Sequence, residues 1–183
     1  NFLLEPLPSR SPEQLTVVWW VNKAWTTEFE GSAPVSGPNF LDWRAENRSF
    51  EHLVATTPRG ISLTGAGPAE PLVATATTAG LFEMLRVGPA LGRTFGLEEE
   101  QPGKHRVAVV SDQFWRTHLG ADPKALGRTL TLDGESFTVI GVMPRGFQNP
   151  SPWSVGQPND LWIPLSADVL RRDPRVVSRE RTN

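Results

Sequence analysis

"TLTLDGESFTVIGV" (residues 129–142) is the stretch that decides the fold, because it holds the clearest local signal in the chain. Two runs of alternating apolar and polar residues flank Asp133 and Gly134. An Asp-Gly pair between such runs favours the two-residue type I′ turn of a β-hairpin. The sequence therefore predicts two antiparallel strands here, each with one buried face.

The segments on either side of this hairpin extend the pattern. "RVAVV" (residues 106–110) predicts a short buried strand, and it runs directly into "SDQFWRTHLG". In that second segment Ser111 is expected to cap a helix and Gly120 to end it. On the C-terminal side, "DLWIPL" (residues 160–165) predicts another short strand. Because proline cannot donate to a β-ladder, Pro164 places that strand at a sheet edge.

The N-terminal part of the chain predicts one strand followed by one helical region. "LTVVWWV" (residues 15–21) is β-branched and aromatic, which favours a strand. "PNFLDWRAENRSFEHLVA" (residues 38–55) has apolar residues at helical spacing, with Asn39 as the expected N-cap. A break is expected near Asn47, and Ser49 can cap a second short helix after it.

The middle of the chain predicts two strands, a helix and an acidic loop. "ISLTG" (residues 61–65) and "EPLVATATT" (residues 70–78) are the strands, and Thr78 is expected to cap a helix over residues 79–86. Residues 96–105 are expected to form a solvated turn, since a run of like charges usually lies on a solvated face. That run is Glu98, Glu99 and Glu100. The whole order of elements predicts an α+β fold with helices on one face of the sheet.

The pentapeptide "ALGRT" occurs twice, at residues 90–94 and 125–129. Each copy follows a predicted helix and precedes β-prone residues, so we interpret it as a turn used twice. Gly92 and Gly127 are expected to have positive φ, which costs another residue about 1–2 kcal/mol. The structural turn glycines predicted from the sequence are Gly92, Gly127 and Gly134. The alternative makes the two arginines that follow the repeated glycines, Arg93 and Arg128, a clamp for an anionic ligand.

Composition excludes several classes of function. The 183 residues carry a net charge of −2 with both signs scattered, so no basic stripe indicates a nucleic-acid partner. Cysteine is absent, which excludes disulfides, thiolate catalysis and cysteine-based zinc sites. The longest apolar run, at residues 15–21, is about a third of the roughly 20 residues that a membrane-spanning helix needs.

Motifs for catalysis and cofactor binding are also missing from the sequence. No Gly-x4-Gly-Lys-Ser/Thr phosphate loop is present. Ser111 lies at a strand-to-helix junction but lacks the flanking glycines of a nucleophile elbow. His52, His105 and His118 are widely spaced, and no two of them share a helical turn. We therefore expect no enzyme activity, and assign no catalytic, cofactor-binding or metal-binding residue.

Taken together, the ordered segments resemble the MacB-like periplasmic core domain of ABC transporter permeases. The matching stretches cover most of residues 3–165. They are "LLEPLPSRSPEQLTVVW", "PNFLDWRAENRSFEHLVA", "GPAEPLVATATTAGLFEMLRVGPALGRTF", "RVAVVSDQFWRTHLGADPKALGRTLTLDGESFTVIGVMPRGF" and "DLWIPL".

The resemblance implies a two-lobed architecture, with a mixed α/β lobe inserted into a porter-like βαβ lobe. Residues 1–14 would be an extended lead-in from a membrane helix, and residues 15–79 the first porter-like unit. Residues 80–165 would be the inserted lobe, and residues 166–183 a charged tail leading to a second porter-like unit. The chain departs from the family pattern by stopping before that second unit, so an exposed sheet edge prone to self-pairing is expected.

The resemblance also implies a function without chemistry. Such a domain lies on the periplasmic side of the bacterial inner membrane and couples the motion of transmembrane helices to export or release of a cargo. The implied partners are the permease's own transmembrane helices, an ABC ATPase, and a periplasmic adaptor protein or a second permease copy. No nucleic acid and no cofactor are implied.

Two other hypotheses remain open at this stage. The first is an extracytoplasmic sensor with an aromatic ligand pocket built from Trp19, Trp43 and Trp162. It predicts a closed, mostly apolar pocket. The second is a hydrolase whose site is assembled only in three dimensions, which requires a histidine within hydrogen-bond reach of an Asp or a Ser.

Overall fold

The computed structural model describes residues 15–18, 20–21, 32–33, 35–65, 67–147 and 158–171. The predicted lead-in over residues 1–14 and residues 172–183 of the predicted tail lie outside the described residues, and so does Trp19.

The predicted hairpin is confirmed. Strand β7 (Thr129–Leu132) pairs antiparallel with β8 (Glu135–Val142). Asp133 and Gly134 between them have φ of 49° and 80°, the two positive values that a type I′ turn requires. The alternating burial of both strands turns Leu130, Leu132 and Phe137 toward the core.

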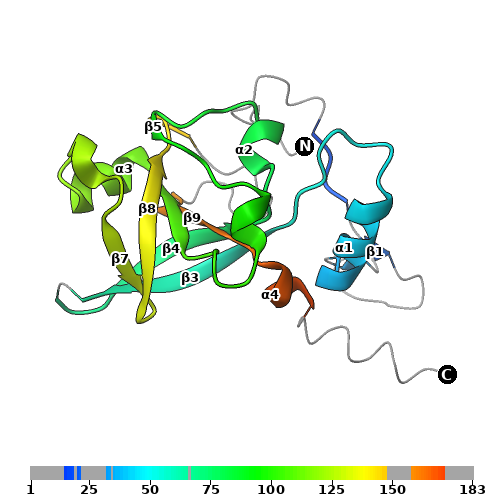
Figure 1. Ribbon diagram of the computed structural model, residues 1–183, viewed down its shortest axis with the longest axis horizontal. Coiled ribbons are helices and arrows are strands. Elements are labelled where there is room, and N and C mark those ends of the chain that lie inside the picture. The colour runs from blue at the N-terminus through cyan, green and yellow to red at the C-terminus, as the bar shows by residue number, and fades with distance from the viewer. Residues whose placement is uncertain are drawn as a thin grey trace, which may run out of the picture.

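Among the described residues, seven strands form one sheet in the order β5-β8-β6-β9-β4-β3-β7, and β7 also pairs with β8. The sheet therefore closes on itself through β8, with β5 as a short addition (Figure 1). The other strands are β3 (Thr56–Thr64), β4 (Glu70–Thr77), β5 (Leu91–Gly92), β6 (Val107–Val110) and β9 (Leu161–Pro164).

Strand β9 corrects the prediction of an edge strand. It lies between β4, which runs parallel to it, and β6, which runs antiparallel, and all four of its residues are buried. Pro164 is tolerated because it is the last residue of the strand, and the next N–H, that of Leu165, donates to the carbonyl of Thr77.

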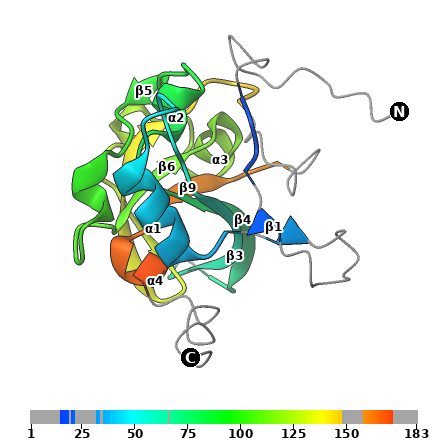
Figure 2. The ribbon, with the colours of Figure 1, turned by 90° about the vertical axis from the view of Figure 1, so that its right-hand side faces the viewer.

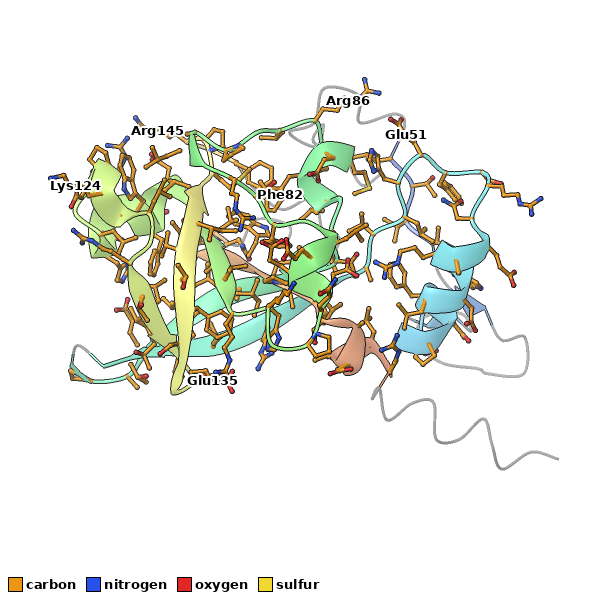
Figure 3. The ribbon with its side chains drawn as sticks, in the orientation of Figure 1. Glu51, Phe82, Arg86, Lys124, Glu135 and Arg145 are labelled. Atoms are coloured by element: carbon orange, nitrogen blue, oxygen red, sulfur yellow. The ribbon has the colours of Figure 1, made fainter. Side chains whose placement is uncertain are left out.

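Two apolar cores lie on opposite faces of the strands. Alternate residues of β4, β6 and β9 belong to the larger core, among them Ala74, Ala108 and Leu161. Val109 of β6 and Trp162 of β9 face the smaller core, where helix α2 (Leu81–Met84) covers the outside of the sheet. Phe82 reaches from α2 toward the sheet, whereas Arg86 points outward (Figure 3).

The helix starts were predicted with mixed success. Helix α3 (Asp112–His118) has its predicted cap, because Ser111 Oγ accepts the N–H of Phe114 at 3.1 Å. Helix α2 begins instead at Gly80, and the predicted cap at Thr78 is wrong. The hydroxyl of Thr78 accepts the N–H of Ala55 at 3.0 Å, so it ties a loop to the end of β4 rather than capping a helix.

Helix α1 (Gly37–Glu46) begins earlier than predicted. Its N-cap is Ser36, so the prediction of Asn39 as cap is wrong: Pro38 occupies the first turn, where a missing N–H costs nothing. The predicted break at Asn47 is confirmed, because its side-chain oxygen accepts the N–H groups of Ser49 and Phe50. Residues 47–55 form no second helix.

A short pair of strands and a last helix complete the described elements. Strand β1 (Trp20–Val21) pairs with β2 (Ser32–Ala33), while residues 15–18 of the predicted first strand are not in a strand. Helix α4 (Ala167–Arg171), which no sequence pattern predicted, packs beside α1 on the side that faces the viewer in Figure 2.

The strands of the predicted first unit and of the predicted inserted lobe share this one sheet. Strands β3 and β4, from residues 15–79, lie between β9 and β7, from residues 80–165. Apart from the short β1–β2 pair, the described strands form no separate sheet on either side of position 79/80, and the division into two lobes stays a prediction.

The exposed sheet edge expected from the sequence stays a prediction. Most strands of the seven-stranded sheet are paired on both sides. Strand β3 is an exception along part of its length, because it pairs with β7 only at Leu63 and Thr64. Residues 56–60 are exposed, and Pro58 lies among them.

Candidate functional site

The prediction that residues 96–105 form a solvated turn is wrong for two of its three glutamates. Its first part is a 3-10 helix, η2 (Leu97–Glu100), and only Glu98 of its three glutamates is solvated. The side chains of Glu99 and Glu100 are 10% and 5% exposed. A buried carboxylate needs charged or hydrogen-bonding partners, and both residues have them.

Glu100 joins two elements that are distant in the sequence. Nη1 of Arg44, on α1, lies 2.9 and 2.8 Å from the two carboxylate oxygens of Glu100. The backbone N–H of Ala79, between β4 and α2, donates to the same carboxylate at 2.7 Å. The guanidinium of Arg44 also lies over the ring of Phe40, 5.3 Å from its centre. Glu100 therefore connects α1 to the junction between β4 and α2.

Glu99 points to a different element. Its carboxylate lies 2.7 Å from Nη2 of Arg93, which follows β5, and accepts the N–H of Gly96 at 2.9 Å. Burial raises the pKa of Glu99, but the hydrogen bond from Gly96 and the charge of Arg93 outweigh it and leave the pKa below its ordinary value. Glu99 is thus held as a carboxylate at neutral pH.

An open groove of about 680 Å³ lies beside this pair of glutamates. Its walls come from α1, from η2 and from the end of α4. The lining residues are Pro38, Leu41, Asp42, Arg44, Ala45, Leu97 and Arg171. The groove is a surface depression rather than the closed apolar pocket that a small-molecule sensor predicts.

The two "ALGRT" copies lie along the same edge of β8. The N–H of Arg93 donates to the carbonyl of Ile140, and the N–H of Gly127 donates to the carbonyl of Val139. Each arginine pairs with a carboxylate six residues away: Arg93 with Glu99, and Arg128 with Asp122 at 2.5 Å. Each guanidinium is thus paired with a carboxylate of its own loop, whereas the anion clamp requires both to face one anionic ligand.

The three glycines singled out from the sequence have positive φ, 75° at Gly92, 84° at Gly127 and 80° at Gly134. Their surroundings differ. A Cβ atom on Gly92 would lie 2.3 Å from the carbonyl oxygen of Ile140, whereas Gly127 and Gly134 have nothing within 4 Å of that position. We propose that all three are turn glycines, and that Gly92 also permits a close approach of two backbones.

Of the histidines, His118 comes nearest to the arrangement that a hydrolase requires. Its Nε2 lies 3.0 Å from a carboxylate oxygen of Glu70, and its Nδ1 lies 2.8 Å from Oγ1 of Thr117. The Thr117 hydroxyl also lies 3.0 Å from the carbonyl of Gln113, to which it can donate. These contacts join the end of α3 to the start of β4.

The other candidates for a site are not assembled either. His52 and His105 lie on separate segments, and the described residues contain no group of three metal-ligating side chains. Trp162 is fully buried between Phe82 and Phe147, with ring centres 6.1 and 5.1 Å away, so it packs in the smaller core. In the described part of the chain, no helix combines the length and the hydrophobicity needed to cross a membrane.

The Arg44–Glu100 contact is the feature that sequence reasoning missed. The two residues are 56 positions apart. Each lies in a segment that looks ordinary by itself, an amphipathic helix and an acidic run. A buried carboxylate cannot be told from a solvated one without its partner, and pairwise variation among relatives is the signal that would have linked them.

Comparison with known proteins agrees with the resemblance drawn from the sequence. The chain matches the MacB-like periplasmic core domain family over residues 4–181. No match was found among curated proteins.

Two solved structures share the fold. The extracellular domain of the noncanonic ABC-type transporter YknZ from Gram-positive bacteria has a TM-score of 0.55 at 14% identity, over 81% of this chain and 68% of that one. The periplasmic region of MacB from Actinobacillus actinomycetemcomitans has a TM-score of 0.54 at 16% identity, over 73% of this chain and 56% of that one. The chain thus spans little more than half of the MacB region. The predicted mixed α/β fold is confirmed, and the protein belongs to the family of MacB-like periplasmic core domains of ABC-type transporter permeases.

Proposed function

We propose that this domain performs no chemistry and couples the motion of transmembrane helices to the export or release of a cargo on the outer side of the bacterial inner membrane. Its partners would be the permease's own transmembrane helices and an ABC ATPase, with a periplasmic adaptor or a second permease copy as a further partner. Membership of the MacB-like family supports this class of function.

The observation that carries the proposal is the meeting of α1 and α4 at one side of the molecule (Figure 2). A Cβ atom on Gly37, in the first turn of α1, would lie only 2.1 Å from the carbonyl oxygen of Leu170 in α4. Helix α1 and the last described helix therefore pack backbone against backbone. A displacement that reaches either helix would be passed to the other, and from there to the closed sheet.

The test uses the full-length permease with its ATPase, reconstituted in lipid nanodiscs. Because this chain has no cysteine, spin labels can be placed in it singly. One label replaces Val169, an exposed residue of α4, and the other is placed at the outer end of a transmembrane helix. We expect the distance between the labels to differ by several ångströms between the nucleotide-free and ATP-bound states, measured by double electron–electron resonance.

A second label pair serves as the internal control. Lys124 and Glu135 are both exposed and lie outside α1 and α4. Their separation should stay constant in every nucleotide state. If the distance from Val169 to the transmembrane helix also stays constant, the coupling role is rejected.

A further inference from the structure

The position of α1 depends on contacts across space rather than on its connection along the chain. Helix α4 follows β9 after only two residues, Leu165 and Ser166, so the end of that strand fixes its start. Helix α1 is joined to β3 by residues 47–55, which contain no helix or strand. The last three of these residues, Leu53, Val54 and Ala55, pack against the two cores, so only residues 47–52 leave α1 free to move unless lateral contacts hold it.

Two kinds of lateral contact hold α1 in the structure. Phe40 is buried in the larger core, and Gly37 packs against Leu170 of α4. Neither contact involves a charged side chain. The charged contact is that of Arg44 with Glu100, which ties the other end of the helix to η2 and, through Ala79, to the end of β4.

Helix η2 has its own attachment, independent of α1. Glu99 binds Arg93 beside β5 and the N–H of Gly96, while the neighbouring Glu100 binds Arg44. Adjacent glutamates thus face in different directions. If Arg44 left, Glu100 would keep the N–H of Ala79, and Glu99 would keep η2 against the sheet.

The environment of Arg44 allows it to leave. Its side chain is 28% exposed and lines the open groove of about 680 Å³, so water and space are next to the guanidinium. Separating an arginine that water can reach costs less free energy than separating one that is enclosed on all sides. The carboxylate, 5% exposed, stays with the sheet.

We propose that the Arg44–Glu100 pair is a releasable contact that fixes the position of α1 on the sheet, and that α1 moves relative to η2 when the pair opens. The proposal rests on the proposed coupling function, since the moving helix is the one that packs on α4. It assigns to Arg44 and Glu100 a positioning role between the ends of the domain and its closed sheet.

The test compares two label pairs in the 183-residue chain. Glu46→Cys on α1 and Glu98→Cys on η2 are each combined with Lys124→Cys, which lies far from α1 (Figure 3). In the Arg44→Gln variant, the distance distribution from Glu46 to Lys124 should gain a second population displaced by several ångströms. The distribution from Glu98 to Lys124 should keep its single peak. Arg44→Lys, which retains the charge, should show a smaller second population than Arg44→Gln.

Arg106→Gln is the matched control, because Arg106 pairs with Glu135 at 3.1 Å with both side chains about half exposed. It should leave both distributions unchanged. Near-ultraviolet circular dichroism checks that each variant is folded. If the Glu46 distribution is unchanged in folded Arg44→Gln, or if both distributions broaden together, the releasable contact is refuted.

Repeating the Glu46 measurement in the full-length permease separates this inference from the proposed function. A second population of the Glu46–Lys124 distance in the isolated Arg44→Gln chain, with no response to nucleotide in the permease, would support the releasable contact and reject the coupling function. A nucleotide-dependent movement of Val169 with an unaltered Glu46 distribution in Arg44→Gln keeps the coupling and rejects the releasable contact.

Discussion

Gly92 and Gly127 occupy the same place in two copies of one pentapeptide but have different neighbours. Both have positive φ, which an alanine adopts at a cost of about 1–2 kcal/mol. Only at Gly92 would the new Cβ meet the backbone of β8, at 2.3 Å from the carbonyl oxygen of Ile140. Backbone cannot yield as the far end of a side chain can.

Gly92→Ala should therefore lower the free energy of unfolding by about 3 kcal/mol, combining strain at positive φ with overpacking. Gly127→Ala should lower it by only about 1 kcal/mol. Equilibrium unfolding in urea measures both. Equal losses of unfolding free energy in the two variants would show that β5 and β8 can move apart at Gly92 without a cost in stability.

Glu99 makes the stability of the domain depend on pH. Its folded-state pKa lies below the ordinary value because the Gly96 hydrogen bond and the Arg93 charge outweigh the effect of burial. A depressed folded-state pKa adds stability above the unfolded-state pKa of about 4.3, and that stability is lost as the pH falls through the folded-state value.

The Glu99→Gln variant should be less stable than the parent chain at pH 7, and the gap between the two should shrink as the pH falls below about 4. Urea midpoints of both chains at a series of pH values between 7 and 3 measure this. A gap that stays constant with pH would contradict the assignment.

At the scale of elements, the β7–β8 hairpin also closes the sheet. Oδ1 of Asp133, in its turn, accepts the N–H of Ser62 in β3 at 2.8 Å, and the N–H of Asp133 donates back to the carbonyl of Ser62. The turn residue that the sequence marks so clearly thus makes a second contact, with a strand 71 residues away.

Asp133→Ala should cost about 2 kcal/mol, because it loses an acceptor and places alanine at positive φ. Asp133→Asn keeps the acceptor oxygen and tolerates that φ, so it should cost less than about 0.5 kcal/mol. Urea unfolding gives both values, and hydrogen exchange of the Ser62 amide should accelerate in the alanine variant alone. Unchanged exchange of the Ser62 amide in the alanine variant would mean that the side-chain oxygen is not the acceptor that protects it.

Elements whose signals are local were predictable from the sequence. The Asp133-Gly134 turn and the Ser111 cap depend on residues within three positions of each other, so the sequence contains the whole interaction. The break at Asn47 has the same origin, a side chain that bonds the backbone two and three residues on.

Features decided by distant partners were not predictable. Pro164 suggested an edge because its missing N–H is visible in the sequence, whereas the parallel pairing of β9 with β4 is not. The burial of Glu100 depends on Arg44, and the start of α1 depends on its packing with α4. In each of these cases tertiary contact overrode a valid local preference.

At the scale of the whole molecule, the interleaved strand order determines how the chain unfolds. Strands β3 and β4 have neighbours from residues 80–165 on both sides. We therefore expect one cooperative transition in urea, with the same midpoint by circular dichroism, by tryptophan fluorescence and by hydrogen exchange in β3–β4 and in β6–β8. Two separate midpoints would instead support independent lobes on either side of position 79/80.

The partly unpaired strand β3 bears on how copies of this molecule behave at high concentration. Ser62 directs its backbone groups toward β7, so Gly60 and Pro58, two and four residues earlier, face the same outer side. Pro58 has no N–H to offer there. A strand of another copy that paired with residues 56–60 would find no N–H donor at Pro58, in the middle of the ladder. These residues therefore resist templated growth of fibrils even though they are solvent-exposed.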